Sequence, residues 1–186
     1  MLKPIVSAAA ALPITLAQVK AQSTVDFGDD DVLLDSYLKA AVAYLDGPSG
    51  VLNVALSPRE VVQSMANFSC MRLPYGPVSA VTLVEYIDLD GVTQTLSGWR
   101  LLEDEEGAIV YFDGTHPAIK SAPDAVSITY TAGFSNGVPQ SLLQAIAMLT
   151  STWYEYRETV TLGSNASKKL PYGVDYLIAP YRRVGV

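Results

Sequence analysis

The spacing of apolar residues changes twice along this chain, and this change limits the folds that it can adopt. Between residues 30 and 46 apolar residues recur every three or four positions, which is typical of an amphipathic helix. From residue 51 they alternate with polar residues, as in half-buried strands, and after Pro139 the helical spacing returns. Strands flanked by helices favour an α+β fold over a parallel α/β array.

We therefore expect a small helical bundle with an inserted antiparallel β block and an extended C-terminal tail. The helices are predicted within about residues 15–46 and 139–158, and the β insertion spans about residues 51–133. Strands are predicted at 61–68, 78–88, 92–96, 99–102, 109–112 and 125–131. Residues 1–158 would form a single α+β domain, and residues 159–186 a polar linker followed by the tail.

Short motifs predict how these elements begin and turn. Thr15 and Gln18 have the spacing of a capping box, and Asp29–Asp31 favour the N-terminal end of a helix. Asp88–Gly91 is typical of a hairpin turn with glycine at positive φ. A metal cluster is the alternative interpretation of Asp29–Asp31, and helix capping is preferred. Asp88–Gly91 resembles the start of a calcium-binding loop, but the sequence does not continue as one, so a turn is preferred.

The scarcity of two residue types excludes most enzyme chemistry. The chain has one cysteine, Cys70, and one histidine, His116, so an internal disulfide is impossible and a zinc site would lack ligands. It also lacks the glycine motifs of P-loop and dinucleotide-binding proteins. We predict no metal site and no cofactor.

A possible nucleophile lies between the last predicted strand and the last predicted long helix. Gly133–Gly137 matches G-x-S-x-G, the nucleophile elbow of α/β-hydrolases, with Ser135 at the centre. In those enzymes the catalytic histidine follows the serine, whereas His116 precedes Ser135. We therefore predict that Ser135 is a turn residue, that the chain has no catalytic residue, and that it is not an enzyme.

The charge of the chain is unevenly distributed. The formal net charge is −7; residues 1–158 hold 18 acidic and 8 basic residues, whereas residues 159–186 carry a net +3. An acidic body argues against binding nucleic acid by phosphate neutralisation. No apolar stretch approaches the roughly 20 residues of a membrane span. The first 17 residues imitate a secretory signal, although Pro4 and Pro13 interrupt them.

Several motifs occur in an order that resembles a known protein family. They are LPITLAQVKAQ, the acidic stretch at 29–31, LPYGPVSAVTLVEYIDLDG, DAVSITYTAGF, VPQSLLQAIAMLTSTWYEYRE and LPYGVDYLIAPYR. This series resembles the head–tail connector, or adaptor, proteins of long-tailed phages and gene transfer agents. The resemblance extends from about residue 12 to residue 183 and implies a structural protein of the particle neck without catalytic residues.

The resemblance also implies partners and a location. Proteins of this family form a ring, of about twelve copies, below the portal protein of the capsid. The ring extends the DNA channel and receives a neck stopper or tail-completion protein. We therefore expect a protein of the virion neck, assembled in the host cytoplasm, with DNA passing through the lumen without sequence-specific binding. Asp29–Asp31 and Glu103–Glu106 are candidate acidic residues of that lumen.

The basic C-terminal segment is the candidate partner-binding site. Residues 159–186 could reach on the order of 90 Å when fully extended, enough to contact the portal or a neighbouring subunit. Tyrosine, aliphatic and arginine side chains are typical interface anchors. The predicted contact residues are Leu170, Tyr172, Tyr176, Leu177, Ile178, Tyr181, Arg182 and Arg183. A tail that folds back onto its own helices is the alternative interpretation.

Two other functions remain open at this stage. A neck stopper or tail-completion protein is the nearest alternative, because sequence does not separate it from an adaptor. A secreted β-rich binding module is an alternative of a different class, and it requires that residues 1–22 be cleaved.

Overall fold

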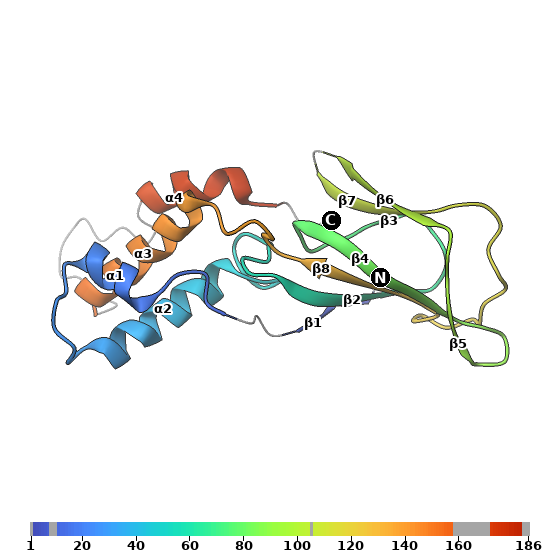
Figure 1. Cartoon of the computed structure of the whole chain (residues 1–186), viewed down its shortest axis with the longest axis horizontal. Helices are drawn as coiled ribbons and strands as arrows, with labels where there is room; N and C mark the ends of the chain where they lie inside the picture. Colours follow the sequence, from blue (N-terminus) through green and yellow to red (C-terminus); the bar gives the residue numbers. More distant parts are fainter. Residues whose placement is uncertain (1, 8–10, 105, 158–171, 184–186) are drawn as a thin grey trace, which may run out of the picture. The chain divides into compact units, whose positions relative to one another are not determined.

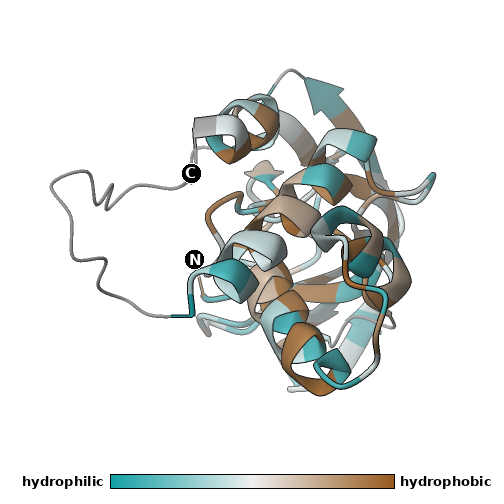
Figure 2. Ribbon diagram, turned by 90° about the vertical axis from the view of Figure 1, so that its left-hand side faces the viewer, coloured by the Kyte–Doolittle hydropathy of each residue, from teal (hydrophilic) through white to brown (hydrophobic). Residues whose placement is uncertain are grey.

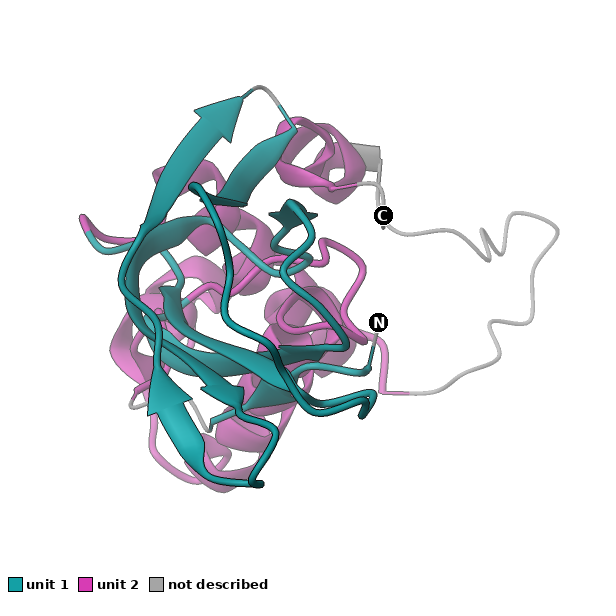
Figure 3. Cartoon of the chain, turned by 90° about the vertical axis from the view of Figure 1, so that its right-hand side faces the viewer, with its two compact units in different colours: residues 1–10, 57–135, 184–186 teal, residues 11–56, 136–183 magenta. Residues whose placement is uncertain are grey.

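The computed structural model describes residues 2–7, 11–104, 106–157 and 172–183. The chain divides into two compact units, which Figure 3 shows in different colours. The β unit comprises residues 1–10, 57–135 and 184–186, and the helical unit comprises residues 11–56 and 136–183. Each unit is thus assembled from segments that lie far apart in the sequence.

The described part of the β unit contains two antiparallel sheets (Figure 1). The five-stranded sheet has the order β1 (Ile5–Val6), β2 (Arg59–Met65), β8 (Val126–Ala132), β4 (Val78–Ile87) and β5 (Thr93–Thr95). The three-stranded sheet has the order β3 (Met71–Arg72), β7 (Gly107–Phe112) and β6 (Trp99–Asp104).

Alternating burial explains why these residues form strands. In the central strand β8, Val126, Ile128, Tyr130 and Ala132 are all 0% exposed, and the residues between them are half-buried. In β7 the buried residues Ala108, Val110 and Phe112 alternate in the same way. One face of each sheet therefore contributes to the core, which is the arrangement that an apolar–polar alternation predicts.

The N-terminal residues add an edge strand that the sequence analysis did not predict. Ile5 and Val6 pair with Val62 and Val61 of β2. The buried Gln63 side chain donates a hydrogen bond from Nε2 to the Leu2 carbonyl at 2.8 Å. Two paired residues are too few to show a period in the sequence, so this strand depends on its tertiary contacts with β2.

The helical unit consists of α1 (Leu16–Ser23), α2 (Asp31–Leu45), α3 (Gln140–Glu155) and α4 (Tyr172–Ile178), followed by a 3₁₀ turn (Ala179–Tyr181). Helix α3 packs against each of the other three helices. Figure 2 shows bands of apolar residues along the helices. The largest fully buried side chains of this unit include Leu34, Leu38, Leu45, Leu142, Ile146 and Leu149.

The predicted α+β fold is confirmed, and so are two local predictions. Thr15 and Gln18 form a complete capping box at the start of α1. Asp88 accepts hydrogen bonds from the backbone N–H groups of Asp90 and Val92, and Gly91 has a φ of 81°. The backbone N–H bonds and the Gln94 side chain hold the pKa of Asp88 below its usual range, Val92 contributing most.

Two local predictions differ from the structure. The acidic stretch does mark the start of α2, with Asp30 at the N-cap and Asp31 in the first turn, as predicted. The Asp30 side chain, however, makes no capping hydrogen bond and instead binds α3, as described below. Residues 172–181 are helical, whereas an extended tail was predicted. Helix α4, with seven residues, is too short to be stable from local propensity alone, so packing against α3 determines its conformation.

Candidate interaction surfaces

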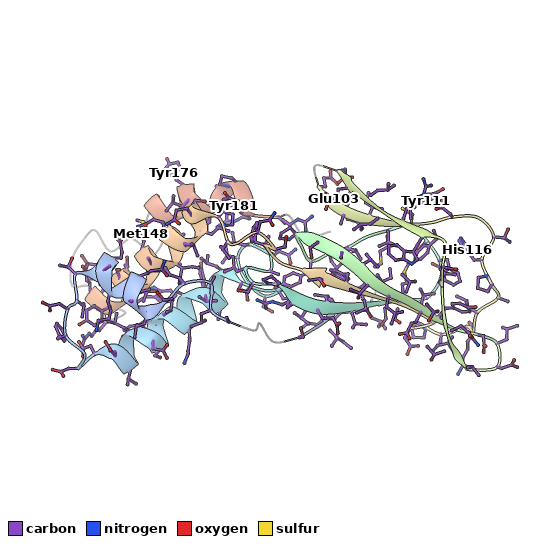
Figure 4. All side chains as sticks on the ribbon, in the orientation of Figure 1. Glu103, Tyr111, His116, Met148, Tyr176 and Tyr181 are labelled. Carbon is purple, nitrogen blue, oxygen red and sulfur yellow. The ribbon has the colours of Figure 1, made fainter. Side chains whose placement is uncertain are left out.

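Helix α4 is anchored on α3 by two apolar side chains. Val174 and Ile178 are 0% exposed. A Cβ atom added to Gly173 would lie 3.0 Å from Cε at the end of the Met148 side chain of α3, so this side chain also packs against α4. After α4, the Ser141 hydroxyl donates to the Tyr181 hydroxyl at 3.2 Å. This segment therefore packs within its own helical unit (Figure 4).

The predicted contact residues have very different environments in this structure. Leu170 and the Tyr172 side chain lie outside the described residues. Ile178 is buried in its own unit, and Leu177, Tyr181 and Arg183 are half-buried.

Two members of the predicted set are exposed. Tyr176 is 79% exposed, and Figure 4 shows its side chain pointing away from the helix. The Arg182 side chain is 47% exposed and lies 3.8 Å from the Asp175 carboxylate. A long, exposed ion pair of this kind contributes little to stability, so Arg182 can exchange partners at low cost. Tyr176 and Arg182 are defined here as the α4 surface.

A polar cluster that sequence reasoning missed joins the start of α2 to the end of α3. The Tyr154 hydroxyl donates to Asp30 Oδ2 at 2.5 Å, and Arg157 donates to the same oxygen at 3.0 Å. The Arg157 guanidinium also lies over the Tyr154 ring, 4.7 Å from its centroid. The Tyr154 hydrogen bond is the main cause that holds the pKa of Asp30 below its usual range. We call these three residues the Asp30 clamp.

The tip of the β6–β7 hairpin is acidic and partly neutralised. Arg72 of β3 binds both carboxylate oxygens of Asp104, at 2.5 and 2.6 Å, and lies 3.3 Å from Glu106. These contacts with Arg72 hold the pKa of Asp104 far below its usual range. Glu103 is exposed and makes no ion pair with the described residues, and Glu105 lies outside them.

The second predicted acidic stretch is also partly neutralised. Asp31 forms an ion pair with Lys20 at 2.6 Å, and Asp30 belongs to the Asp30 clamp. Asp29 is exposed and forms no ion pair within the described part of the chain. Of the described residues proposed from sequence for an acidic lumen, Asp29 and Glu103 are therefore exposed and not neutralised by their own chain.

Ser135 lies in a turn, as predicted from the sequence. It is exposed, and its hydroxyl makes no hydrogen bond to the residues that the structure describes. His116 instead packs in a ring cluster, with centroids 4.9 Å from Phe68 and 6.0 Å from Phe112. Over the same described ranges, no three His, Cys, Asp or Glu side chains form a group suited to a metal ion. None of the described helices is long and apolar enough to cross a membrane.

Chains of known structure share this fold over the whole length of the protein. A chain in the virion of a native gene transfer agent particle has a TM-score of 0.76 and 27% identity, with 100% of this chain and 97% of that chain covered. A chain in the neck of an empty gene transfer agent particle, computed with C6 symmetry, has a TM-score of 0.74 and 26% identity at the same coverage.

A third chain extends this comparison. It lies in the neck of a native gene transfer agent particle computed with C12 symmetry, with a TM-score of 0.68 and 27% identity over 98% of this chain and 97% of that one. No family model and no curated protein sequence matches this chain. The similarity thus covers both units and does not stop at one shared element.

Proposed function

We propose that this protein is a structural component of the neck of a phage or gene-transfer-agent particle. The observation that carries the proposal is the likeness to neck and virion chains over essentially the whole length of both proteins, at 26–27% identity. Similarity over the full length supports a shared place in the particle more strongly than similarity limited to the β unit or to the helical unit would.

Within the neck, we propose the role of an adaptor. Its copies form a ring below the portal, of about twelve subunits, and join the capsid to a stopper or tail-completion protein. The C6 and C12 symmetry of the necks that contain similar chains supports a ring. Asp29 is the candidate channel residue, because an exposed acidic lumen repels DNA and lets it slide.

The α4 surface is the proposed contact with the portal or with a neighbouring subunit. Tyr176 provides a large exposed ring with few rotatable bonds, and Arg182 provides a charge held only by a long ion pair. Tyrosine and arginine are enriched among residues that dominate binding energy at interfaces. Ile178, although predicted as a contact, serves this surface by anchoring α4 to α3.

The test is purification from producing cells with an N-terminal tag, followed by mass spectrometry and negative-stain microscopy. We expect the wild-type chain to bring down portal protein together with rings or particles. The double variant Tyr176→Ala/Arg182→Ala should lose most of the portal, whereas Lys39→Ala, which changes an exposed lysine on α2, should retain it. Particles labelled at the tag would show whether the chain lies next to the portal or next to the tail, which separates an adaptor from a stopper. A soluble, intact chain that never accompanies particle proteins would refute the neck role.

A further inference from the structure

One continuous segment forms the free edge of both sheets in the β unit. Strand β5 ends the five-stranded sheet, and β6, which follows it in sequence, ends the three-stranded sheet. Three residues, Leu96–Gly98, connect the two strands, and Gly98 has a φ of 112° where the chain bends. We call residues 93–103 the β5–β6 edge.

The backbone hydrogen bonds show which groups of this edge face outward. In β5, the Leu96 N–H donates to the Val84 carbonyl, and Val92 accepts from Asp88, so the even-numbered residues face β4. In β6, the Asp113 N–H donates to the Gly98 carbonyl, so the even-numbered residues again face the neighbouring strand, β7. In an antiparallel pair the intervening residues direct their backbone groups away from the partner.

Strand β3 provides an independent check of this assignment. Ala108 of β7 lies opposite Glu103, and its carbonyl accepts a hydrogen bond from the Leu73 N–H on the far side. The Ala108 backbone groups thus face β3, away from β6. In a pair of opposite residues that do not bond each other, both residues direct their backbone groups away from the partner, so the Glu103 backbone groups face away from β7. The outward-facing residues of the edge are Thr93, Thr95, Ser97, Trp99, Leu101 and Glu103.

This edge has no partner among the described residues. Its outward-facing residues are exposed or half-buried, and no hydrogen bond joins their backbone groups to another described residue. The other edge strands, β1 and β3, are two residues long. Residues 92–104 contain no proline and no lysine, which commonly protect exposed edges from pairing. Of the charged residues in this segment, Arg100 and Asp104 form ion pairs with Asp113 and Arg72, whereas Glu103 forms none with the described residues. Strand β6, with six residues, is longer than the other edge strands and therefore has the properties of a strand-addition site.

Charge indicates what kind of strand can occupy the edge. The Asp88–Asp90 turn lies just before its first residue, and the acidic hairpin tip follows Glu103 at the other end. Two copies paired edge to edge in antiparallel fashion would bring the tip of one against the Asp88–Asp90 turn of the other. Parallel pairing would bring tip against tip. Like charges opposite each other destabilise a strand pair, so a second copy of the same edge is disfavoured.

We propose that the β5–β6 edge receives an extended segment of a different protein, with a lysine or arginine beside Glu103. Apolar or β-branched side chains of that segment would cover the half-buried side chains of Trp99 and Leu101, which border the core. The source of the segment, another protein of the particle neck, rests on the function proposed above. The pairing itself rests on the register, exposure and charge of the edge.

The experiment removes one outward backbone donor without touching the sheet. Glu103→Pro deletes an N–H that no described residue uses, and proline is tolerated on the free side of an edge strand. Glu103→Val is the matched control, since it also removes the carboxylate but keeps the N–H and favours a strand. Circular dichroism and thermal unfolding of the purified variants test whether both remain folded, and we expect that they do.

The first readout is the amount of each variant in purified particles. We expect Glu103→Val to be incorporated at more than half the wild-type level and Glu103→Pro about tenfold less, as loss of one buried backbone hydrogen bond predicts. Hydrogen exchange of peptides covering residues 93–103 should be slow in particles and fast in the free chain. Equal incorporation of the two folded variants, or fast exchange in particles, overturns the proposal while the neck role stands.

The second readout does not depend on particles. A fluorescently labelled synthetic peptide of alternating valine and threonine, with a lysine at each end, is titrated into the full-length wild-type chain and both variants. We expect the wild type to bind it most tightly and Glu103→Val to bind somewhat more weakly, because it lacks the carboxylate that pairs with lysine. Glu103→Pro, which also lacks the backbone N–H, should bind about tenfold more weakly than Glu103→Val. If the wild-type chain is absent from particles, the proposed neck role is refuted. This titration alone then tests whether the β5–β6 edge binds an extended segment. Absence of binding, or equal binding by Glu103→Val and Glu103→Pro, overturns the proposal.

Discussion

Both units join segments that are distant in sequence, but different interactions hold those segments together. In the β unit, β1 and β8 are joined to β2 by backbone ladders, which are largely independent of side-chain identity. In the helical unit, the segments 11–56 and 136–183 are joined chiefly by side chains, through helix packing and the Asp30 clamp. The helical unit should therefore be the more sensitive of the two to single substitutions.

The largest effect is expected at the centre of the helical core. Leu142 of α3 is 0% exposed, and Leu142→Ala removes its contacts and leaves a cavity, which costs about 3–5 kcal/mol of the free energy of unfolding. Ile128→Ala in β8, which is equally buried and loses the same number of carbon atoms, should cost less, about 2–3 kcal/mol, because the backbone ladders of β8 remain. Urea denaturation followed by circular dichroism measures the free energy of unfolding of both variants. An equal or smaller cost for Leu142→Ala than for Ile128→Ala would contradict the comparison.

A second substitution tests whether α4 belongs to the helical core. Ile178→Ala should cost about 2–3 kcal/mol, because it removes one of the two buried anchors of α4. Hydrogen exchange of residues 172–181 should then accelerate while that of β8 stays unchanged. Tyr176→Ala, on the exposed face of the same helix, should change stability by less than about 0.5 kcal/mol. If the two variants behave alike, α4 is not held by its apolar face.

A third substitution probes the backbone of the β unit. Gly133, just after β8, has a φ of 127°, and a Cβ atom there would lie 2.6 Å from backbone atoms of Ser57. Gly133→Ala should therefore cost at least about 1–3 kcal/mol, since both strain and a backbone clash must be relieved. At Gly91, with a φ of 81° and no atom within 4 Å of an added Cβ, Gly91→Ala should cost only about 1 kcal/mol. Thermal unfolding of the two variants compares them directly.

The smallest effect concerns pH and the Asp30 clamp. The folded-state pKa of Asp30 is lowered, first by the Tyr154 hydrogen bond, so the clamp contributes stability above the unfolded-state pKa of about 4. That contribution is lost as the pH falls below about 4 through the lowered pKa. Tyr154→Phe should therefore reduce the acid dependence of unfolding, with little change in helix content. An identical pH profile for wild type and Tyr154→Phe would show that the clamp does not affect stability.

The features that the sequence predicted correctly are those that depend on interactions between residues close in sequence. Strands such as β8 were predictable because buried and half-buried residues alternate over seven positions. The long helices α2 and α3 were predictable from their apolar stripes, and the cap of α1 from Thr15 and Gln18. These features depend on neighbours in sequence, so the sequence displays them directly.

The remaining features depend on partners distant in sequence. Strand β1 has two paired residues, and α4 has seven residues that include Gly173, so neither shows a usable period. The Asp30 clamp joins residues 124 and 127 positions apart, and no local motif marks it. Likewise, the outward direction of the β5–β6 edge follows from the register with β4 and β7, which sequence alone does not provide.

The register between β2 and β8 has a consequence for how this architecture can change over time. Arg59 lies opposite Ala132, so the chain enters and leaves the segment 57–135 at two adjacent points. A segment whose ends are neighbours can be lost, gained or replaced as one cassette, because a short turn can close the gap. Among the described strands, β1 would then remain without its partner β2. The segment 57–135 could thus be exchanged between lineages while the helices that flank it in sequence are retained.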